Sequence, residues 1–284
     1  MYQEKHTTLE SLLAAVRACR ACEGELPLGP RPVLRAAASA RILIVGQAPG
    51  ARVHRTGIPW DDLSGARLRT WMGVGEDIFY DESRIAIIPM GYCYPGRGKG
   101  GDLPPRRECA RLWLDALLER LPMIELTLLI GRHAQRHFLG RRRKSSLAAT
   151  VDAWRDYTPA FIPLPHPSPR NTPWLQRHPG FERRLLPELR KRVDAIVARG
   201  NLPAHDPASP GRSGPVNEGS SFVFSIASSA TTERAKAPEE PRCVSADREI
   251  DRRGKRDADR YGHCDVPEAV QRRRTVQRER TGSF

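Results

Sequence analysis

The sequence predicts a three-layer α/β/α fold with a central four-stranded, mainly parallel sheet. Short apolar runs alternate with amphipathic helical patterns along the first 199 residues, as expected of strands joined by helical crossovers. The runs lack alternating polar residues, which is typical of strands buried on both faces. From residue 200 onward Pro, Ser, Gly, Arg and Glu dominate, and apolar residues follow no period. We therefore predict a folded domain at 1–199 and a low-complexity, disordered C-terminal tail at 200–284.

Each predicted element rests on a local pattern. The four apolar runs that predict strands are Ile42–Val45, Ile85–Met90, Glu125–Gly131 and Phe161–Pro165. Apolar residues at helical spacing predict helices at Leu9–Arg20, Ala66–Met72, Glu108–Leu121, His133–Leu139 and Phe181–Gly200, the last interrupted near Pro187. The stretch Ala51–Gly65 is polar and punctuated by glycine, so we expect a long binding loop there.

Charge and hydropathy limit the classes of partner. The net charge of +14 lies mostly in residues 1–199, which carry 32 Lys and Arg against 20 Asp and Glu. A basic domain favours an anionic partner such as nucleic acid, although many basic proteins bind none. The basic run Arg141–Lys144 is either a solvated surface or a phosphate contact. No apolar run spans a bilayer, and Met1–His6 lacks the pattern of a signal peptide, so we expect a cytoplasmic protein without membrane contact.

Two segments at predicted strand ends hold the most unusual residues. The first strand stops at a tight turn, Gly46–Gly50, with the sequence Gly-Gln-Ala-Pro-Gly. The fourth leads into His166-Pro167-Ser168-Pro169, followed by Arg170 and Asn171. A phosphate-binding loop would need Gly-Lys-Ser/Thr after the first turn, and the chain has Ala51 and Arg52 there.

Together with the Arg-Thr-Gly-x-Pro-aromatic stretch at 55–60, these motifs resemble the active-site motifs of the uracil-DNA glycosylase superfamily, especially its iron–sulfur-containing bacterial branches. The resemblance extends over about residues 5–199. It implies the uracil-DNA glycosylase fold and a monofunctional glycosylase of base-excision repair, a hydrolase that cleaves the N-glycosidic bond of uracil or another deaminated base. We expect a monomer whose partner is DNA containing deaminated bases.

The chemistry of base removal matches the residue types. The base must leave its stack and depart as an anion while the sugar becomes oxocarbenium-like. Trp60 offers a flat face for stacking, unless it is a core side chain. His166 offers a donor for the base oxygen on which charge develops. The residues expected to bind substrate are Gly46, Gln47, Ala48, Pro49, Gly50, Trp60, Ser168, Arg170 and Asn171.

This sequence differs from the family pattern at the two positions that supply the water-activating acid. The best-known branch has an Asp where this chain has Ala48, and the iron–sulfur branch has a Glu where this chain has Gln47. With no carboxylate in the turn, we expect Asp61 or Asp62 to act with His166 in catalysis. His54 is a second candidate.

Cysteines form a further pattern. Cys19-x2-Cys22 and Cys93-x15-Cys109 resemble the spacing by which the family's iron–sulfur branches hold a [4Fe–4S] cluster. Zinc bound by the same four sulfurs, or four unliganded thiols, are the alternatives. Cys243 and Cys264 lie in the predicted tail, where we expect free thiols.

Two functions of other classes stay open. A protein with the same fold and cluster, but without the turn carboxylate, would only bind damaged or single-stranded DNA. An α/β enzyme acting on small nucleotides would not need the basic surface.

Overall fold

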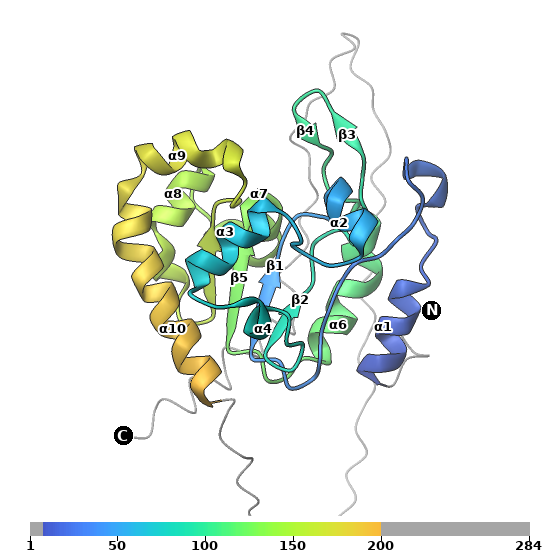
Figure 1. Cartoon of the computed structure of the whole chain (residues 1–284), viewed down its shortest axis with the longest axis horizontal. Coiled ribbons are helices and arrows are strands. Elements are labelled where there is room, and N and C mark those ends of the chain that lie inside the picture. The colour runs from blue at the N-terminus through green and yellow to red at the C-terminus, as the bar shows by residue number, and fades with distance from the viewer. Residues whose placement is uncertain (1–7, 200–284) are drawn as a thin grey trace, which may run out of the picture. The chain divides into compact units, whose positions relative to one another are not determined.

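The fold is built on a four-stranded parallel sheet (Figure 1). A computed structural model describes residues 8–199, and our predictions for residues 200–284, including Cys243 and Cys264, lie outside the described residues. The strand order is β2-β1-β5-β6, and each neighbouring pair is parallel. The strands are β1 (Ile42–Val45), β2 (Ile85–Ile87), β5 (Leu126–Ile130) and β6 (Phe161–Leu164). The predicted fold class of the domain is confirmed.

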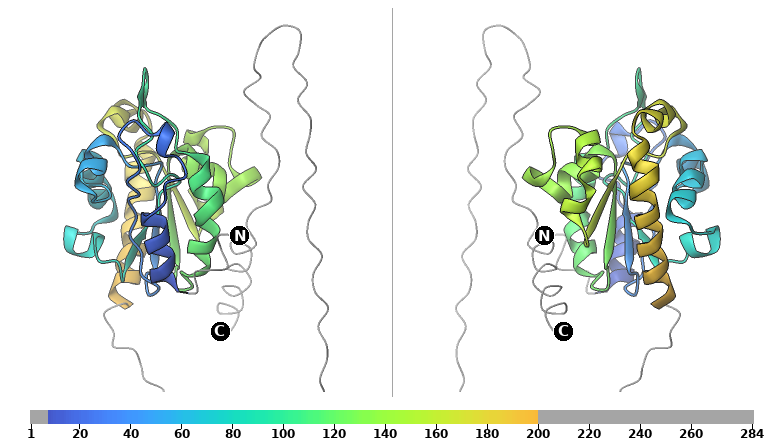
Figure 2. Two further views of the ribbon diagram at one scale, coloured as in Figure 1. Left: turned by 90° about the vertical axis from the view of Figure 1, so that its right-hand side faces the viewer. Right: turned by 90° about the vertical axis from the view of Figure 1, so that its left-hand side faces the viewer.

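Helices cover both faces of the sheet (Figure 2). Every residue of the four strands is buried, because successive side chains enter different cores. On one face Leu43 and Val45 pack with α1 (Leu9–Arg17), α6 (Asp115–Glu119) and α7 (Gly131–Leu139). On the other face Ile42 and Ile44 pack with α3 (Leu63–Met72) and α10 (Leu186–Arg199). The continuous apolar runs of the strands follow from this double burial.

Shorter elements complete the described part of the chain. The remaining α-helices are α2 (Ala51–Thr56), α4 (Glu76–Phe79), α5 (Arg107–Cys109), α8 (Leu147–Asp152) and α9 (Thr172–Arg177). Short 3-10 turns are η2 (Glu23–Glu25), η4 (Gly140–Arg142), η5 (Trp154–Tyr157) and η6 (Pro169–Asn171), while η3 (Ala110–Leu114) and η7 (Phe181–Leu185) are π-helical. A small antiparallel hairpin joins β3 (Arg97–Gly98) and β4 (Gly101–Asp102). Across residues 8–199, no helix has both the length and the apolar character needed to cross a membrane.

Several predicted boundaries were wrong. The long loop predicted at 51–65 contains α2, which starts after Gly50 and ends at Gly57, a left-handed residue with φ 74°. The α3 helix starts at Leu63, because Asp62 caps it through a hydrogen bond from the Gly65 N–H. The second strand stops at Ile87, two residues before Pro89, which has no N–H to donate to a ladder. The first helix ends at Arg17, and α8 and α9 were not predicted because each is only six residues long.

A buried glutamine fixes the end of the sheet from which two loops leave. Gln135 on α7 is 3% exposed, and its Nε2 donates hydrogen bonds to the carbonyl oxygens of Leu129 (3.3 Å) and Leu164 (3.0 Å). One side chain therefore joins the carboxyl-terminal ends of β5 and β6. His166 follows Leu164 by two residues, so the position of this histidine depends on the same anchor.

Replacing Gln135 tests this anchor. Gln135→Ala should lower the free energy of unfolding by about 1–3 kcal/mol, because two buried hydrogen bonds are lost. Urea unfolding followed by circular dichroism measures the change. The control is Gln176→Ala on α9, where the glutamine is exposed and the expected change is within about 0.5 kcal/mol. Equal stability of the two variants would contradict the anchor.

Candidate functional site

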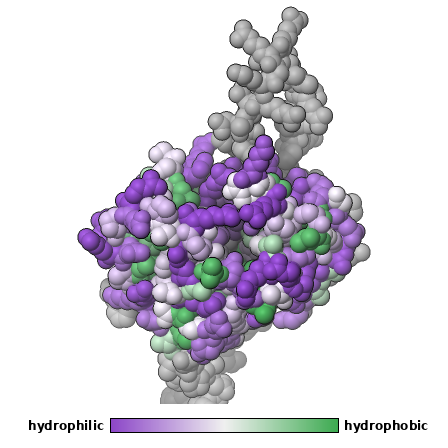
Figure 3. Space-filling view, turned by 45° about the horizontal axis from the view of Figure 1, so that its top comes forward, coloured by the Kyte–Doolittle hydropathy of each residue, from purple (hydrophilic) through white to green (hydrophobic). Residues whose placement is uncertain are grey.

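The candidate site lies where the strand order reverses. From β1 the chain moves outward to β2 and then returns past β1 to β5 and β6, so β1 and β5 flank the reversal. Open parallel sheets bind ligands at the carboxyl ends of their strands at such a point. Here the loops that follow β1 and β6 border a cavity of about 720 Å³. Figure 3, tilted to bring this edge forward, shows a surface dominated by hydrophilic side chains.

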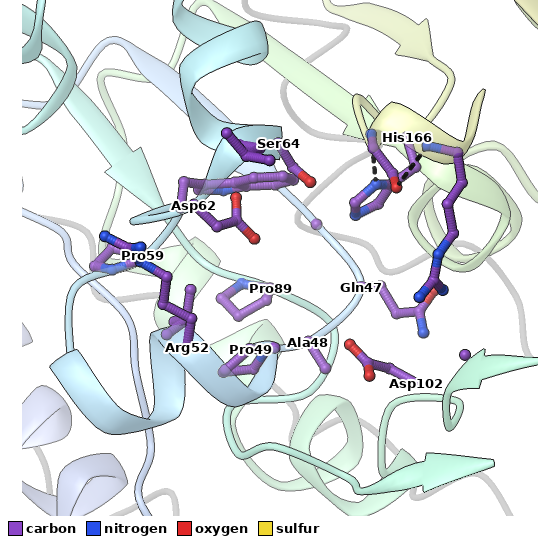
Figure 4. Close-up of a pocket in the computed structure, with 18 of the residues that line it drawn as sticks. Gln47, Ala48, Pro49, Arg52, Pro59, Asp62, Ser64, Pro89, Asp102 and His166 are labelled. Atoms are coloured by element: carbon purple, nitrogen blue, oxygen red, sulfur yellow. Dashed lines mark hydrogen bonds between the residues drawn. The ribbon is translucent and has the colours of Figure 1, made fainter. Parts of the chain in front are cut away.

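Nearly all of the sequence-predicted site residues meet in this cavity (Figure 4). Those that line it are Gly46, Gln47, Ala48, Pro49, Gly50, Trp60, Asp62, His166, Ser168, Arg170 and Asn171. Asp61 and the second candidate, His54, do not line it. Segments more than 100 residues apart in the sequence therefore form one site.

Backbone hydrogen bonds to another segment fix the turn that follows β1. The carbonyl oxygens of Gly46 and Gln47 accept hydrogen bonds from the N–H groups of Met90 (3.0 Å) and Gly91 (2.9 Å). The turn is thus bound to the segment that follows β2. A β-carbon at Gly46 would lie 2.9 Å from Cζ2 of Trp60, so glycine is needed for the indole to approach the turn.

Trp60 forms one wall of the cavity. Its φ of 59° is left-handed, which is rare for a bulky residue and marks a conformation held by its surroundings. A β-carbon on Gly65 would lie 1.7 Å from the Trp60 carbonyl oxygen. Trp60 is half-buried at the edge of the core, with its ring centroid 5.6 Å from that of His166. Trp60 is therefore both a side chain packed against the core and a wall of the site, the two alternatives that the sequence left open.

His166 is held in a defined orientation and protonation state. Its Nδ1 accepts a hydrogen bond from the Ser168 N–H (3.2 Å), and its carbonyl oxygen accepts one from Asn171 Nδ2 (2.7 Å). Burial lowers the pKa of His166, while the negative charges of Asp62 and Asp102 act in the opposite direction. The ring is therefore neutral near pH 7 with its proton on Nε2. His166 therefore presents a neutral hydrogen-bond donor at the cavity wall (Figure 4).

The two acids beside Trp60 have different environments. Asp62 lines the cavity, and its Oδ1 accepts the Gly65 N–H (2.8 Å) as the cap of α3. Asp61 pairs with Arg52 at 3.4 Å, outside the cavity lining. His54 is 8% exposed and lies 6.3 Å from the ring of Tyr94, also outside the lining.

A comparison with known families agrees with this geometry. Residues 35–190 match the family model described as the uracil DNA glycosylase superfamily, and this range is more than half of the chain. The chain belongs to the uracil DNA glycosylase superfamily. The family predicted from the two motifs is confirmed.

In this superfamily member, the sequence did not predict three charged residues that belong to the site or support it. Arg52 and Asp102 line the cavity. Arg67 lies on α3 and joins that helix to the segment at 168–172. Arg67 donates from Nη1 to the Ser168 carbonyl oxygen and from Nη2 to Thr172 Oγ1, both at 3.2 Å. For Asp102 the sequence did hold a signal, because the glycine-rich stretch before it is typical of a tight hairpin. A lone Arg within a helical pattern gives no such signal.

The four cysteines of the predicted cluster form no disulfide bond with one another, and their sulfurs interact electrostatically. Burial raises the pKa of Cys93 to about 11 and of Cys109 to about 12. For both thiols, negative charge on Cys19 and Cys22 raises the pKa further, so the four sulfurs are electrostatic neighbours. Over residues 8–199, no group of three or more Cys, His, Asp or Glu side chains has an arrangement that could hold a metal ion. The assignment of these four cysteines as the ligands of a metal cluster thus stays a prediction.

Gly65→Ala tests the contact between Trp60 and α3. Replacing a helical glycine by alanine ordinarily stabilises a helix by about 0.5–1 kcal/mol. Here we expect a loss of about 1–3 kcal/mol in the free energy of unfolding, because the new methyl group overlaps backbone. Chemical denaturation provides the measurement.

The matched control is Gly24→Ala, where a β-carbon would meet nothing within 4 Å. We expect its stability to stay within about 0.5 kcal/mol of the wild type. A Gly65→Ala protein as stable as the Gly24→Ala protein would refute the close contact.

Proposed function

We propose that this protein is a monofunctional DNA glycosylase that removes uracil or another deaminated base from DNA. Membership of the superfamily makes glycosylase chemistry on DNA the expected activity. The observation that carries the proposal is the neutral His166, which lies beside Trp60 in the cavity lining, with its ring centroid 5.6 Å from that of the indole and its proton on Nε2. A flat apolar face and a fixed neutral donor are what a departing base requires.

In this mechanism the extruded base lies against Trp60 and the turn at 46–50. Stacking on an aromatic ring contributes on the order of 1–3 kcal/mol per base. The contact of Gly46 with the indole keeps Trp60 at the turn before any base arrives. The site therefore binds a base without first rearranging this wall.

His166 acts on the leaving base. As the glycosidic bond breaks, negative charge develops on the base, and Nε2–H donates to a base oxygen. Because the Ser168 N–H holds Nδ1, the donor keeps its direction during the reaction. The interaction is stronger with the anion than with the neutral base, so it stabilises the transition state more than the ground state.

Phosphate contacts would come from the rim. Arg170 is exposed beside the cavity, and Arg67 holds the 168–172 segment that carries it. Both are part of a domain with a strong excess of positive charge. Phosphate contacts of this kind position DNA without reading its sequence.

A cleavage assay tests the proposal. The full-length protein is incubated with duplexes and single strands containing uracil, hypoxanthine or xanthine, and abasic sites are revealed by alkali. We expect cleavage of at least one substrate and a loss of about 100-fold or more in His166→Ala, because the donor for the base anion is removed. The control is His178→Ala, which removes a histidine stacked on Trp174 outside the cavity lining and should retain wild-type activity.

A non-catalytic role in binding damaged or single-stranded DNA is the competing function. The turn without a carboxylate favours it, since Gln47 and Ala48 cannot accept a proton from water. Absence of abasic sites on every substrate, together with retained DNA binding, would replace our proposal with this one.

We also propose that Cys19, Cys22, Cys93 and Cys109 hold a [4Fe–4S] cluster. Four thiolates are the ligand set of such clusters, and the mutual influence of the four sulfurs supports a common site. Burial disfavours the thiolates when no cation is near, and bound metal would reverse this effect. The group would connect the segment after α1 to that after β2 and stabilise both, with no part in base removal.

Iron content tests this assignment. Anaerobically purified protein should show an absorbance band near about 400 nm and about four iron atoms per chain. Cys109→Ser should lose the band, while Cys264→Ser, in the tail, should keep it. Stoichiometric zinc without colour would assign the same cysteines to zinc, and a colourless, metal-free protein would leave them as thiols.

A further inference from the structure

Hydrolysis of the glycosidic bond also needs a group that accepts a proton from the attacking water. The turn offers only Gln47 and Ala48, and an amide and a methyl group do not act as bases. The Gln47 amide is also occupied, because its Nε2 donates to the Leu103 carbonyl oxygen at 3.1 Å. A carboxylate from another segment must take this role if the enzyme is to hydrolyse the bond efficiently.

Asp102 lies where such a carboxylate is needed. It ends the β3–β4 hairpin and lines the cavity. Its Oδ2 lies 3.6 Å from the position of a β-carbon on Gly50, and its carboxylate is directed at Ala48 (Figure 4). Within residues 8–199 the carboxylate forms no hydrogen bond or ion pair. It is also exposed, so water reaches it from the cavity mouth.

Contacts with the turn hold the hairpin in this position. The hydrogen bond from Gln47 fixes Leu103, the neighbour of Asp102. The Leu103 N–H donates to the Gly96 carbonyl oxygen at 2.9 Å, which closes the base of the hairpin. On the other side, Arg170 Nη1 lies 2.9 Å from the position of a β-carbon on Gly101. Both site loops therefore contact the segment that carries Asp102.

The other acids near the cavity are less suited. Asp61 is paired with Arg52 at 3.4 Å and lies outside the lining. Asp62 uses Oδ1 to cap α3, which fixes its carboxylate beside Trp60. One of its two oxygens is therefore already engaged by the backbone at the helix start. Asp102 has no such partner.

We propose that Asp102 is the catalytic carboxylate that orients and deprotonates the attacking water, an assignment that rests on the glycosylase function proposed above. The bond between C1′ and the base nitrogen breaks, and its electron pair leaves with the base, which Nε2–H of His166 stabilises. A solvent water forms the new bond to C1′ and gives one proton to Asp102. That proton then passes through solvent to the base anion, so the products are neutral base and an abasic sugar.

Substitution of Asp102 tests the role. Single-turnover cleavage at saturating enzyme is measured on the substrate that the wild type cleaves best, and dissociation constants are measured separately. We expect Asp102→Asn and Asp102→Ala to lower the cleavage rate constant by about 100-fold or more. The dissociation constant for substrate DNA should rise by less than about threefold, because the loss falls on the chemical step. Asp77→Asn, which changes an exposed aspartate on α4, is the matched control and should cleave at the wild-type rate.

The rival acids complete the design. Asp62→Asn keeps an oxygen that caps α3, and we expect it to lose much less activity than Asp102→Ala. Wild-type rates in both Asp102 variants, with a large loss in Asp62→Asn or Asp61→Asn, would overturn the assignment while leaving the glycosylase function intact. A wild-type protein that produces no abasic sites would instead overturn the proposed function, and this assignment with it.

Discussion

Trp60 lies against Gly46 and Gly65, and at both positions only the absence of a β-carbon permits the contact. Through the first contact the indole meets the turn after β1, and through the second its backbone meets the start of α3. The left-handed φ of Trp60 follows from being held between them. The turn, the helix start and the aromatic wall therefore form one rigid unit, and the cavity takes its shape from that unit.

The sheet was predictable because its chemistry is repetitive. Ile42–Val45 and Leu126–Ile130 are buried on both faces, and double burial leaves a continuous apolar run that is visible without any tertiary knowledge. The motifs that start at Gly46 and His166 were predictable as partners for a related reason. Both follow strands of one parallel sheet, so both had to emerge at the same edge.

The remaining parts depend on contacts that the local sequence does not encode. The α2 helix has only six residues between Gly50 and Gly57, too few for a period to emerge from the polar background. Arg67 has the pattern of an ordinary surface cation, and its bonds to the 168–172 segment exist only once α3 lies beside it. Positive charge is likewise a poor guide to free surface, since Arg41 and Arg199 both pair with Glu125 at 2.5 Å.

The hydrogen bond between Gln47 and Leu103 joins positions that are 56 residues apart in the chain. It joins a short hairpin to a turn that hydrogen bonds from Met90 and Gly91 already hold in place. The turn that lines the cavity and the hairpin that carries Asp102 are therefore separate pieces of sequence. A change in the length or terminal residue of the hairpin leaves the backbone hydrogen bonds of the turn to Met90 and Gly91 in place, so in the proposed enzyme base binding and water activation depend on segments that can be altered separately.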